Sequence, residues 1–310
     1  QLDHGAMNPA GKLVVWLVTD GKPGHENQSR GLAEALTRAT PSEIHLYPAL
    51  PAWRAGLAWL LKNLPGQSLP SPDLIIGAGH ATHMTLLATR RAEGGRAVVL
   101  MKPSLPRRCF DLCILPQHDG VAPDAHTLLS EGAINRVRPA PGRDASRGLL
   151  LIGGVSNHFE WDSDAIQVQI KSIVARMPDI HWTLTTSRRT PNDFLAQLPT
   201  APNLTVLPHT ATAPDWLPEQ LARSGTVWVT PDSASMVYEA LTAGAEVGVF
   251  DLPVNPKSRI GWAIAHLADG QRITRFVNWC AHGKLLPNLH PLAEADRCAN
   301  WILEWLKKKN

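Results

Sequence analysis

The stretch TVWVTPDSASMVYEAL, residues 226–241, joins the pattern of a buried strand to the start of a helix. Its first four residues suit a strand, and Asp232 and Ser233 follow at the position where a helix would begin. The first amide groups of a helix have no partner within the helix and attract anions. When the stretch is taken alone, capping of the helix by Asp232 or Ser233 is the simpler interpretation. The rest of the chain decides whether the stretch is more than a cap.

The same strand-then-helix pattern recurs along the chain. Apolar runs of strand length come at residues 12–19, 73–78, 97–101, 111–115, 148–152, 181–186 and 246–250. Strands that alternate with helices in this way form parallel sheets. We therefore predict an α/β fold with two similar doubly wound domains.

A segment rich in Pro, Gly and Arg, residues 139–147, divides the alternating pattern into two halves. Such a composition is typical of a linker. We predict an N-terminal domain over residues 7–142 and a C-terminal domain over residues 143–290. Residues 291–310 would form a helix that packs back on the N-terminal domain.

The composition argues against several classes of protein. The 310 residues are 44% hydrophobic and carry a formal net charge of +3, which is too small to indicate nucleic acid as a partner. The four cysteines have the spacing of neither a disulfide framework nor a zinc site, and no metal is expected. No run of about 18 apolar residues and no leader is present, so we expect a cytoplasmic protein. Peripheral contact at the inner face of a membrane is left open.

Three loops of the second half follow strands whose carboxyl ends would lie at one edge of a parallel sheet. They offer glycine backbone, guanidinium groups and a helix N-terminus, which together suit a diphosphate. If the loops do not converge, they are a turn, a solvated arginine pair and a cap. The candidate donor-site residues are Gly153, Gly154, Ser156, Asn157, Ser187, Arg188, Arg189, Asp232, Ser233 and Ser235. No GxGxxG or GxxxxGK[ST] fingerprint is present, which disfavours a dehydrogenase or a P-loop NTPase.

His25 stands in a glycine-containing loop after the first strand, in the stretch DGKPGHENQ, residues 20–28. Imidazole titrates near neutral pH, so His25 is our candidate general base. A histidine that only bonds within its own loop is the alternative. Ser29 is expected to cap the helix that follows. The candidate acceptor-side residues are Gly21, Lys22, Gly24, Gln28 and His80, the last from the loop after another predicted strand.

Two further patterns have both a structural and a functional interpretation. Asp162-Ser163-Asp164 is a D-x-D, which holds a metal in some sugar transferases, but it directly precedes a helical pattern, where N-capping is the commoner role. The helical patterns with Trp53 and Trp59, and with Trp301 and Trp305, fit either core packing or a helix lying on a membrane surface. Core packing is the commoner explanation.

Four motifs of the chain resemble those of the mitochondrial fission (elongated mitochondria) family. They are DGKPGHENQ at 20–28, GGVS at 153–156, SRRTP at 187–191 and DSASMVYEA at 232–240. The resemblance implies a GT-B-like architecture of two Rossmann-like domains with a cleft between them. Bacterial members of the family are described as glycosyltransferases, and plant members as fission adaptors.

The arrangement is also similar to the N-acetylglucosamine transferase of peptidoglycan lipid synthesis. By that similarity His25 would face the acceptor, and the loops at 153–157, 187–189 and 232–239 would hold the donor. Glu239 would then bind donor hydroxyls, and Met236 joins the donor set from the same motif. The first loop departs from the richer glycine loop of that enzyme.

We therefore predict a glycosyltransferase that moves a sugar from a nucleoside-diphosphate donor to a cell-envelope glycan or glycolipid, such as a lipopolysaccharide core. No cofactor is expected beyond the nucleotide sugar, which is a substrate. A helix dipole and cations would stabilise the departing diphosphate in place of a metal. A nucleotide-sugar epimerase on the same fold and a non-catalytic scaffold are the alternatives.

Overall fold

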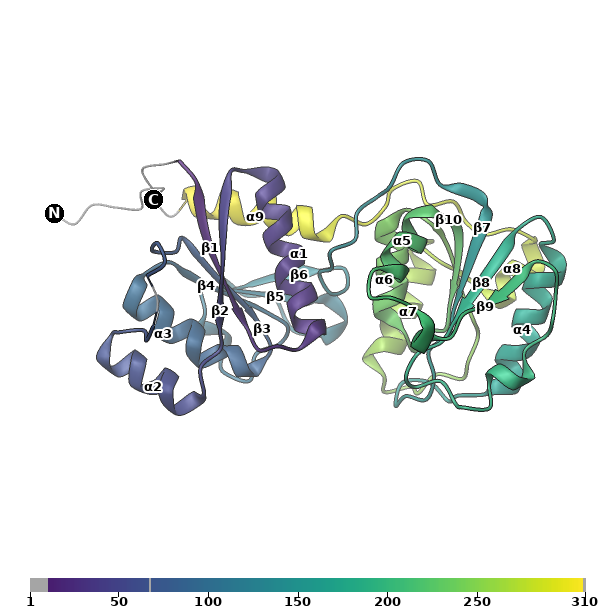
Figure 1. Ribbon diagram of the computed structural model, residues 1–310, viewed down its shortest axis with the longest axis horizontal. Coiled ribbons are helices and arrows are strands. Elements are labelled where there is room, and N and C mark those ends of the chain that lie inside the picture. The colour runs from purple at the N-terminus through teal and green to yellow at the C-terminus, as the bar shows by residue number, and fades with distance from the viewer. Residues whose placement is uncertain (1–10, 67, 309–310) are drawn as a thin grey trace. The chain divides into compact units, whose positions relative to one another are not determined.

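A computed structural model of the chain describes residues 11–66 and 68–308 (Figure 1). The chain forms two compact units, one of the residues up to Arg136 with those from Ala293 onward, the other of Val137–Leu292. The predicted division at residues 142 and 143 therefore falls inside the second unit. The division comes earlier because Val137 packs against the apolar core of that unit.

The first unit is built on a six-stranded sheet with the order β2-β1-β3-β4-β5-β6, in which every neighbouring pair is parallel. The strands are β1 (Leu13–Thr19), β2 (Ser42–Pro48), β3 (Leu74–Ala78), β4 (Arg96–Leu100), β5 (Leu112–Pro116) and β6 (Thr127–Ser130). Helices α1 (Pro23–Ala39) and α9 (Glu294–Lys308) cover one face, and α2 (Ala52–Leu61) and α3 (His83–Glu93) the other. Short 3₁₀ turns η1 (His80–Thr82), η2 (Arg107–Cys109) and η3 (Gln117–Asp119) complete it.

The second unit repeats this plan with the strand order β12-β11-β10-β7-β8-β9, again all parallel. The strands are β7 (Asp144–Leu151), β8 (His181–Thr185), β9 (Leu204–Val206), β10 (Ser224–Val229), β11 (Glu246–Val249) and β12 (Thr274–Arg275). Helices α5 (Trp216–Arg223), α6 (Ala234–Ala243) and α7 (Arg259–Asp269) pack on one face, and α4 (Ser163–Arg176) and α8 (Phe276–His282) on the other. The 3₁₀ turns are η4 (Leu195–Gln197) and η5 (His209–Ala211). Two Rossmann-like doubly wound sheets are therefore confirmed.

Each sheet has one point where the chain reverses the direction in which it adds strands. In the first sheet this point lies between β1 and β3, and in the second between β7 and β10. Ligands of open parallel sheets bind at the carboxyl ends of the strands beside such a point. The connections there are residues 20–22 and Gly79 in the first unit, and residues 152–162 and 230–233 in the second.

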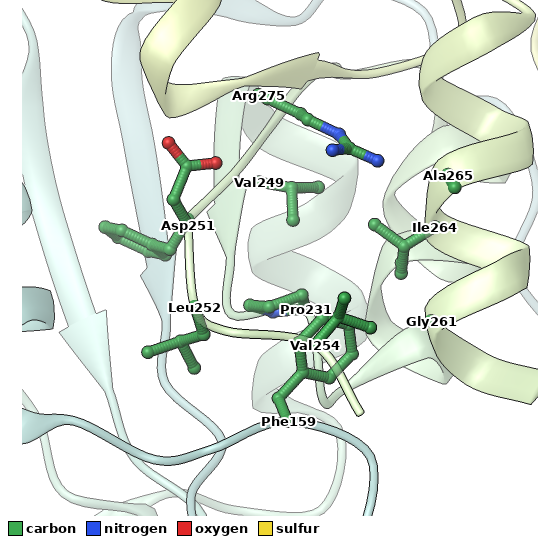
Figure 2. A pocket seen from close by; sticks show the side chains of 11 residues that line it. Phe159, Pro231, Val249, Asp251, Leu252, Val254, Gly261, Ile264, Ala265 and Arg275 are labelled. Atoms are coloured by element: carbon green, nitrogen blue, oxygen red, sulfur yellow. The ribbon is translucent and has the colours of Figure 1, made fainter. Parts of the chain in front are cut away.

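A pocket of about 110 Å³ lies at the same edge of the second sheet (Figure 2). Apolar side chains from the end of β11, the segment after it and α7 form most of its wall. Asp251 and Arg275 lie on the side away from Phe159. Because Pro231 is part of the wall, the pocket adjoins the connection between β10 and α6.

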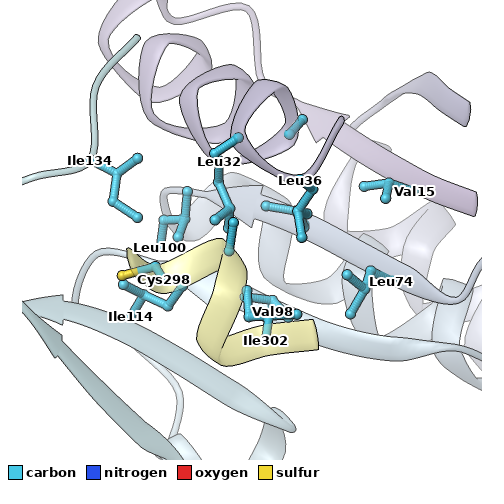
Figure 3. Close-up of a cluster of buried hydrophobic side chains, with 14 of the residues drawn as sticks. Val15, Leu32, Leu36, Leu74, Val98, Leu100, Ile114, Ile134, Cys298 and Ile302 are labelled. Atoms are coloured by element: carbon cyan, nitrogen blue, oxygen red, sulfur yellow. The ribbon is translucent and has the colours of Figure 1, made fainter. Parts of the chain in front are cut away.

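Helix α9 completes the core of the first unit. Cys298 and Ile302 are fully buried, and they point into the same cluster as Leu32 and Leu36 of α1 (Figure 3). Trp305 packs against this cluster from its edge. No helix in the described part of the chain is long and apolar enough to cross a membrane.

Helix α1 begins at Pro23, six residues before the expected cap at Ser29. Proline suits the first turn of a helix because its fixed φ angle is already helical and its missing amide hydrogen would have no partner there. Ser29 is buried, and its hydroxyl donates to the carbonyls of His25 and Glu26. His25 therefore lies in the first turn of a helix and not in a free loop.

Replacing Ile302 by Ala should lower the free energy of unfolding by about 2–5 kcal/mol, because a fully buried branched side chain leaves a cavity. Lys307→Ala is the matched control in α9, since the Lys307 side chain is 72% exposed and pairs only with Glu304 among the described residues. Its effect should stay within about 0.5 kcal/mol. Denaturant melts of both variants provide the measurement, and equal effects would contradict the assignment of α9 to this core.

Candidate functional site

Three loops of the second unit meet at the switch point of its sheet. The Asp232 carboxylate accepts a hydrogen bond from the amide of Gly154 at 3.0 Å, and Nη1 of Arg189 lies 2.8 Å from the same oxygen. Nη1 of Arg189 also donates to the carbonyls of Gly154 and Val155, both at 3.2 Å. The loops after β7, β8 and β10 are therefore joined directly, as the strand order predicts.

The two glycines after β7 allow the loops to pack this closely. A Cβ atom at Gly153 would collide with the carboxylate of Asp232, and one at Gly154 would collide with the carbonyl of Arg189. The Gly153 amide donates to Oγ1 of Thr230 at 2.8 Å, and the Gly154 amide to Asp232. Contrary to expectation, these amides do not face a ligand, because the neighbouring loops already use them.

Asp232 does not cap α6. Ser233 occupies the N-cap position, and neither its hydroxyl nor any other described side chain bonds to the amides of the first turn. Asp162 of the D-x-D motif, by contrast, caps α4 by accepting from the Ala165 amide at 3.0 Å, so the capping interpretation of that motif is confirmed. The N-terminus of α6 therefore keeps its unpaired amides and the positive end of its dipole.

The second oxygen of Asp232, Oδ1, has no hydrogen-bond partner among the described residues, although it is buried. The side chain is completely enclosed, with 0% of its surface exposed. Leaving a buried acceptor unpaired is unfavourable, so such groups mark places where a further donor fits. A water or a ligand hydroxyl could supply it.

The two arginines after β8 have different environments. Arg189 is held by Asp232 and by two backbone carbonyls, and its Nη2 donates to Oγ of Ser233 at 3.2 Å. Arg188 is exposed and makes no hydrogen bond or ion pair with the residues that the structure describes. Oγ of Ser187 accepts from the Arg189 amide at 3.3 Å, within the same turn. Both guanidinium groups are exposed, but Arg188 is the one whose hydrogen-bond donors are not already used by described residues.

The remaining donor-site candidates lie around the α6 N-terminus or on the loop after β7. Ser235 is exposed in the first turn of α6, and Met236 beside it is half-buried. Oγ of Ser156 accepts from the His158 amide at 3.2 Å, so it stabilises its own turn. Asn157 is exposed.

Glu239 follows Ser235 by one turn of α6, on the same side of the helix. Burial raises the pKa of its carboxyl to about 7. The residue keeps some contact with solvent, and among the described residues nothing bonds to its carboxyl. A carboxyl in this setting is suited to accept hydrogen bonds from ligand hydroxyls.

The pocket of Figure 2 and its two charged residues, Asp251 and Arg275, are not among the residues predicted from the sequence. Burial raises the pKa of Asp251, although the hydrogen bond from the Val277 amide and the charge of Arg275 oppose the shift. Asp251 could have been found by the carboxyl-end rule, because it follows β11 closely. Arg275 ends a strand of two residues, which is too short to recognise from periodicity.

In the first unit, the switch point holds a carboxylate–imidazole pair. Nδ1 of His25 lies 2.6 Å from Oδ2 of Asp20, whose side chain is 4% exposed. Burial alone would raise the pKa of Asp20, but hydrogen bonds from His25 and the Lys22 amide hold it below its usual value. Asp20 is therefore ionised and favours the tautomer with the proton on Nδ1, which leaves Nε2 of His25 able to accept a proton.

Asp20 was quoted in the first motif but not recognised as the orienting group. Gly79, after β3, packs against this pair: a Cβ atom there would lie 2.5 Å from the His25 ring, and its φ of +89° favours glycine. His80 follows it and is exposed. The other acceptor-side candidates surround His25 at the start of α1: Gly21, Lys22 and Gly24 are exposed, and Gln28 is half-buried.

His83 is buried, lies 3.2 Å from Oγ of Ser104 through Nδ1, and packs edge-on against Phe110, so it has a packing role. Within residues 11–66 and 68–308, no group of three or more His, Cys, Asp or Glu side chains is placed to hold a metal ion.

Arg189→Ala should lower the free energy of unfolding by about 2–4 kcal/mol, because it leaves the buried Asp232 carboxylate without its cation. Arg188→Ala is the matched control, and its effect should stay within about 0.5 kcal/mol. Denaturant unfolding measures both. The double variant Arg189→Ala/Asp232→Ala should lose less stability than the two single losses added together, and strict additivity would contradict the ion pair.

Glu239→Gln should make stability less dependent on pH. The folded-state pKa of about 7 lies above the unfolded value near 4.5, so the wild-type protein loses stability as pH rises from about 4.5 to 7. Above that range the variant should be more stable than wild type by about 1–3 kcal/mol, and near pH 4 the two should match. Thermal melts from pH 4 to 8 measure this, with the exposed Glu160→Gln as the control that should track wild type. Parallel curves for Glu239→Gln and wild type would rule out the raised pKa.

Solved structures with the same fold include nucleotide-sugar enzymes. A protein described as a UDP-N-acetylglucosamine 2-epimerase, from Listeria monocytogenes, has a TM-score of 0.62 at 12% identity, with 96% of each chain covered. The Neisseria meningitidis UDP-GlcNAc 2-epimerase bound to UDP-GlcNAc has a TM-score of 0.50 at 12% identity, covering 96% of this chain and 100% of that one. A glycosyltransferase from Rickettsia africae has a TM-score of 0.51 at 10% identity, covering 96% and 98%. At these identities the likeness shows the fold alone, which is that of the GT-B glycosyltransferases and related epimerases.

Comparisons of sequence are more specific. An uncharacterized protein of Rickettsia prowazekii is 29% identical over 121 residues, which are 34% of this chain and 32% of that protein. The match thus spans about a third of that relative's length. The profile of the Mitochondrial fission ELM1 family matches residues 23–306, nearly the whole of the described chain. The chain therefore belongs to the mitochondrial fission ELM1 family.

Proposed function

We propose that this protein is a nucleotide-sugar-dependent glycosyltransferase. The observation that carries the proposal is the N-terminus of α6, which lies at the switch point of the second sheet without a side-chain cap. The exposed Arg188 stands on a loop that contacts the same point through Arg189. Unpaired amides, a helix dipole and a guanidinium are the groups that bind the diphosphate of a nucleotide sugar.

The donor would lie with its diphosphate at the first turn of α6, within reach of Arg188 and Ser235. Its hydroxyls would bond to Glu239, one turn further along the helix. The pocket beside Pro231 offers apolar surface next to the diphosphate for a less polar part of the donor. Arg189 and the glycine loop do not bind the donor in this proposal, because their polar groups are used to join the loops.

His25 would act as the general base. Nε2 takes the proton from an acceptor hydroxyl, and the acceptor oxygen bonds to the anomeric carbon of the donor sugar. The bond between that carbon and the diphosphate breaks, and the diphosphate leaves with the electron pair. Arg188 and the α6 dipole stabilise the negative charge on the leaving group, a task that a metal ion performs in other transferases. Asp20 keeps the His25 ring oriented and stabilises the imidazolium.

The proposed acceptor is a cell-envelope glycan or glycolipid, such as a lipopolysaccharide core, at the cytoplasmic face of the membrane. This choice rests on the resemblance of the motifs to envelope glycosyltransferases. The second candidate is a nucleotide-sugar epimerase, which the similarity to the Listeria and Neisseria structures favours. An epimerase converts the nucleotide sugar without any acceptor, whereas a transferase needs one.

A panel of nucleoside-diphosphate sugars tests the donor site by thermal shift. The matching donor at about 100 times its Kd should stabilise the protein by about 2.7 kcal/mol, which raises Tm by about 4–8 °C. Arg188→Ala should weaken that donor by about tenfold or more without lowering the Tm of the free protein. If every nucleotide sugar leaves Tm unchanged, the protein is not a transferase of this kind and the scaffold alternative stands. Product formed from the donor alone would establish the epimerase instead.

The base is tested separately, once a donor and an acceptor are in hand. His25→Ala should lower kcat by about 10²–10⁴-fold while donor binding stays unchanged. Asp20→Asn should also lower kcat, because the amide no longer stabilises the imidazolium. His282→Ala, an exposed histidine of the second unit, is the control. If His25→Ala retains full turnover, His25 is not the general base, but the proposed donor site is unaffected by that result.

A further inference from the structure

Helix α2 of the first unit carries its large apolar side chains on its exposed face. Its buried residues are Ala55 and Ala58. The exposed ones are Trp53, Leu57, Leu60 and Leu61, at 72, 48, 65 and 63% exposure. They follow each other at the spacing of a single helix face. The expectation that this stripe packs in the core is wrong, because α2 contacts α3 and the sheet through its small residues.

A contiguous exposed apolar face is unusual on the surface of a soluble protein. Single exposed apolar side chains are common, but four large ones on three turns of one helix mark a surface that another body covers. The second turn also presents Trp59, whose ring lies 4.0 Å under the guanidinium of Arg91 of α3. Tryptophan and leucine side chains together suit the interface between an apolar phase, such as the interior of a membrane, and water.

The charged residues of α2 and its flanking segments are all positive, and half-buried Glu93 of α3 is an acidic residue that acts on the same Tyr47 hydroxyl as Arg54. Between Glu43 and Asp73 the sequence contains no acidic residue. Arg54 and Lys62 flank the apolar stripe and are exposed, as is Arg91 beside it. Cations around an apolar helix face complement an anionic lipid surface, where the apolar side chains enter the headgroup boundary and the cations meet the lipid charges.

We propose that α2 docks the first unit on an anionic membrane surface, with Trp53, Leu57, Leu60 and Leu61 inserted and with Arg54 and Lys62 at the headgroups. The helix has 10 residues, about 15 Å long, so it lies along the surface and does not cross it. Docking would hold the His25 unit at the plane where a glycolipid presents its sugar. It requires no nucleotide sugar, so it can be tested whether or not the transfer reaction is correct.

The experiment is co-sedimentation of the full chain with vesicles of phosphatidylcholine alone and of phosphatidylcholine mixed with phosphatidylglycerol. Wild type should bind the mixed vesicles and bind the neutral ones at least about tenfold more weakly. Trp53→Ser/Leu57→Ser/Leu60→Ser should reduce binding to the mixed vesicles by at least about tenfold. Arg54→Gln and Lys62→Gln should each reduce it about fivefold at low salt. Because all these side chains are exposed, the variants should keep the wild-type melting temperature.

Leu289→Ser is the matched control, since Leu289 is an equally exposed apolar residue (75%) of the second unit, and its binding should equal that of wild type. Absence of vesicle binding by wild type would overturn the proposal. So would binding that the triple variant retains. Light scattering tests whether this face instead binds a second copy of the chain. That would be the conclusion if wild type self-associates, the triple variant does not, and neither binds vesicles. If no nucleotide sugar raises Tm in the thermal-shift panel, the proposed function is contradicted, but the vesicle experiment still decides whether α2 binds membranes.

Discussion

The arrangement of the loops in the second unit depends on one buried carboxylate. Asp232 takes its position from the loop after β10, yet its oxygen bonds to the Gly154 amide and pairs with Arg189, which come from two other loops. A carboxylate this deeply enclosed is stable as an anion only when its partners replace the lost water. Three loops that are far apart in the sequence are thus held in one arrangement, and the α6 N-terminus is left uncapped as a result.

The two switch points use a buried aspartate in different ways. In the first unit Asp20 holds a side chain that can gain and lose a proton, and in the second Asp232 holds one that is always charged. The first pairing leaves Nε2 of His25 available for its proposed role as a proton acceptor, whereas the second holds the loops together. The two aspartates stand on opposite sides of their switch points, because Asp20 follows β1, the first strand of its sheet, and Asp232 follows β10, which is added on the other side of β7.

Periodicity and the carboxyl-end rule were sufficient to predict both sheets and the meeting of the three loops, since strands buried on both faces are apolar throughout. They could not predict how Asp232 is used, because a capping carboxylate and a buried ion-paired one occur in the same local sequence. The orientation of α2 was hidden for a similar reason. A stripe of large apolar residues has the same spacing whether it faces inward or outward. In α2 the face that is buried carries the small side chains of Ala55 and Ala58, and the helix packs against α3.

The place of α9 has a consequence for how the protein is made. The first unit lacks Cys298, Ala299 and Ile302 of its core until the last helix has been synthesised, although its sheet is among the first parts of the chain to appear. The second unit, Val137–Leu292, is continuous, and its core clusters contain no residue of α9. The unit that begins first in the sequence therefore cannot complete its core until the whole of the second unit has been synthesised. Until then, the face of α1 that α9 covers stays open to chaperones and to aggregation.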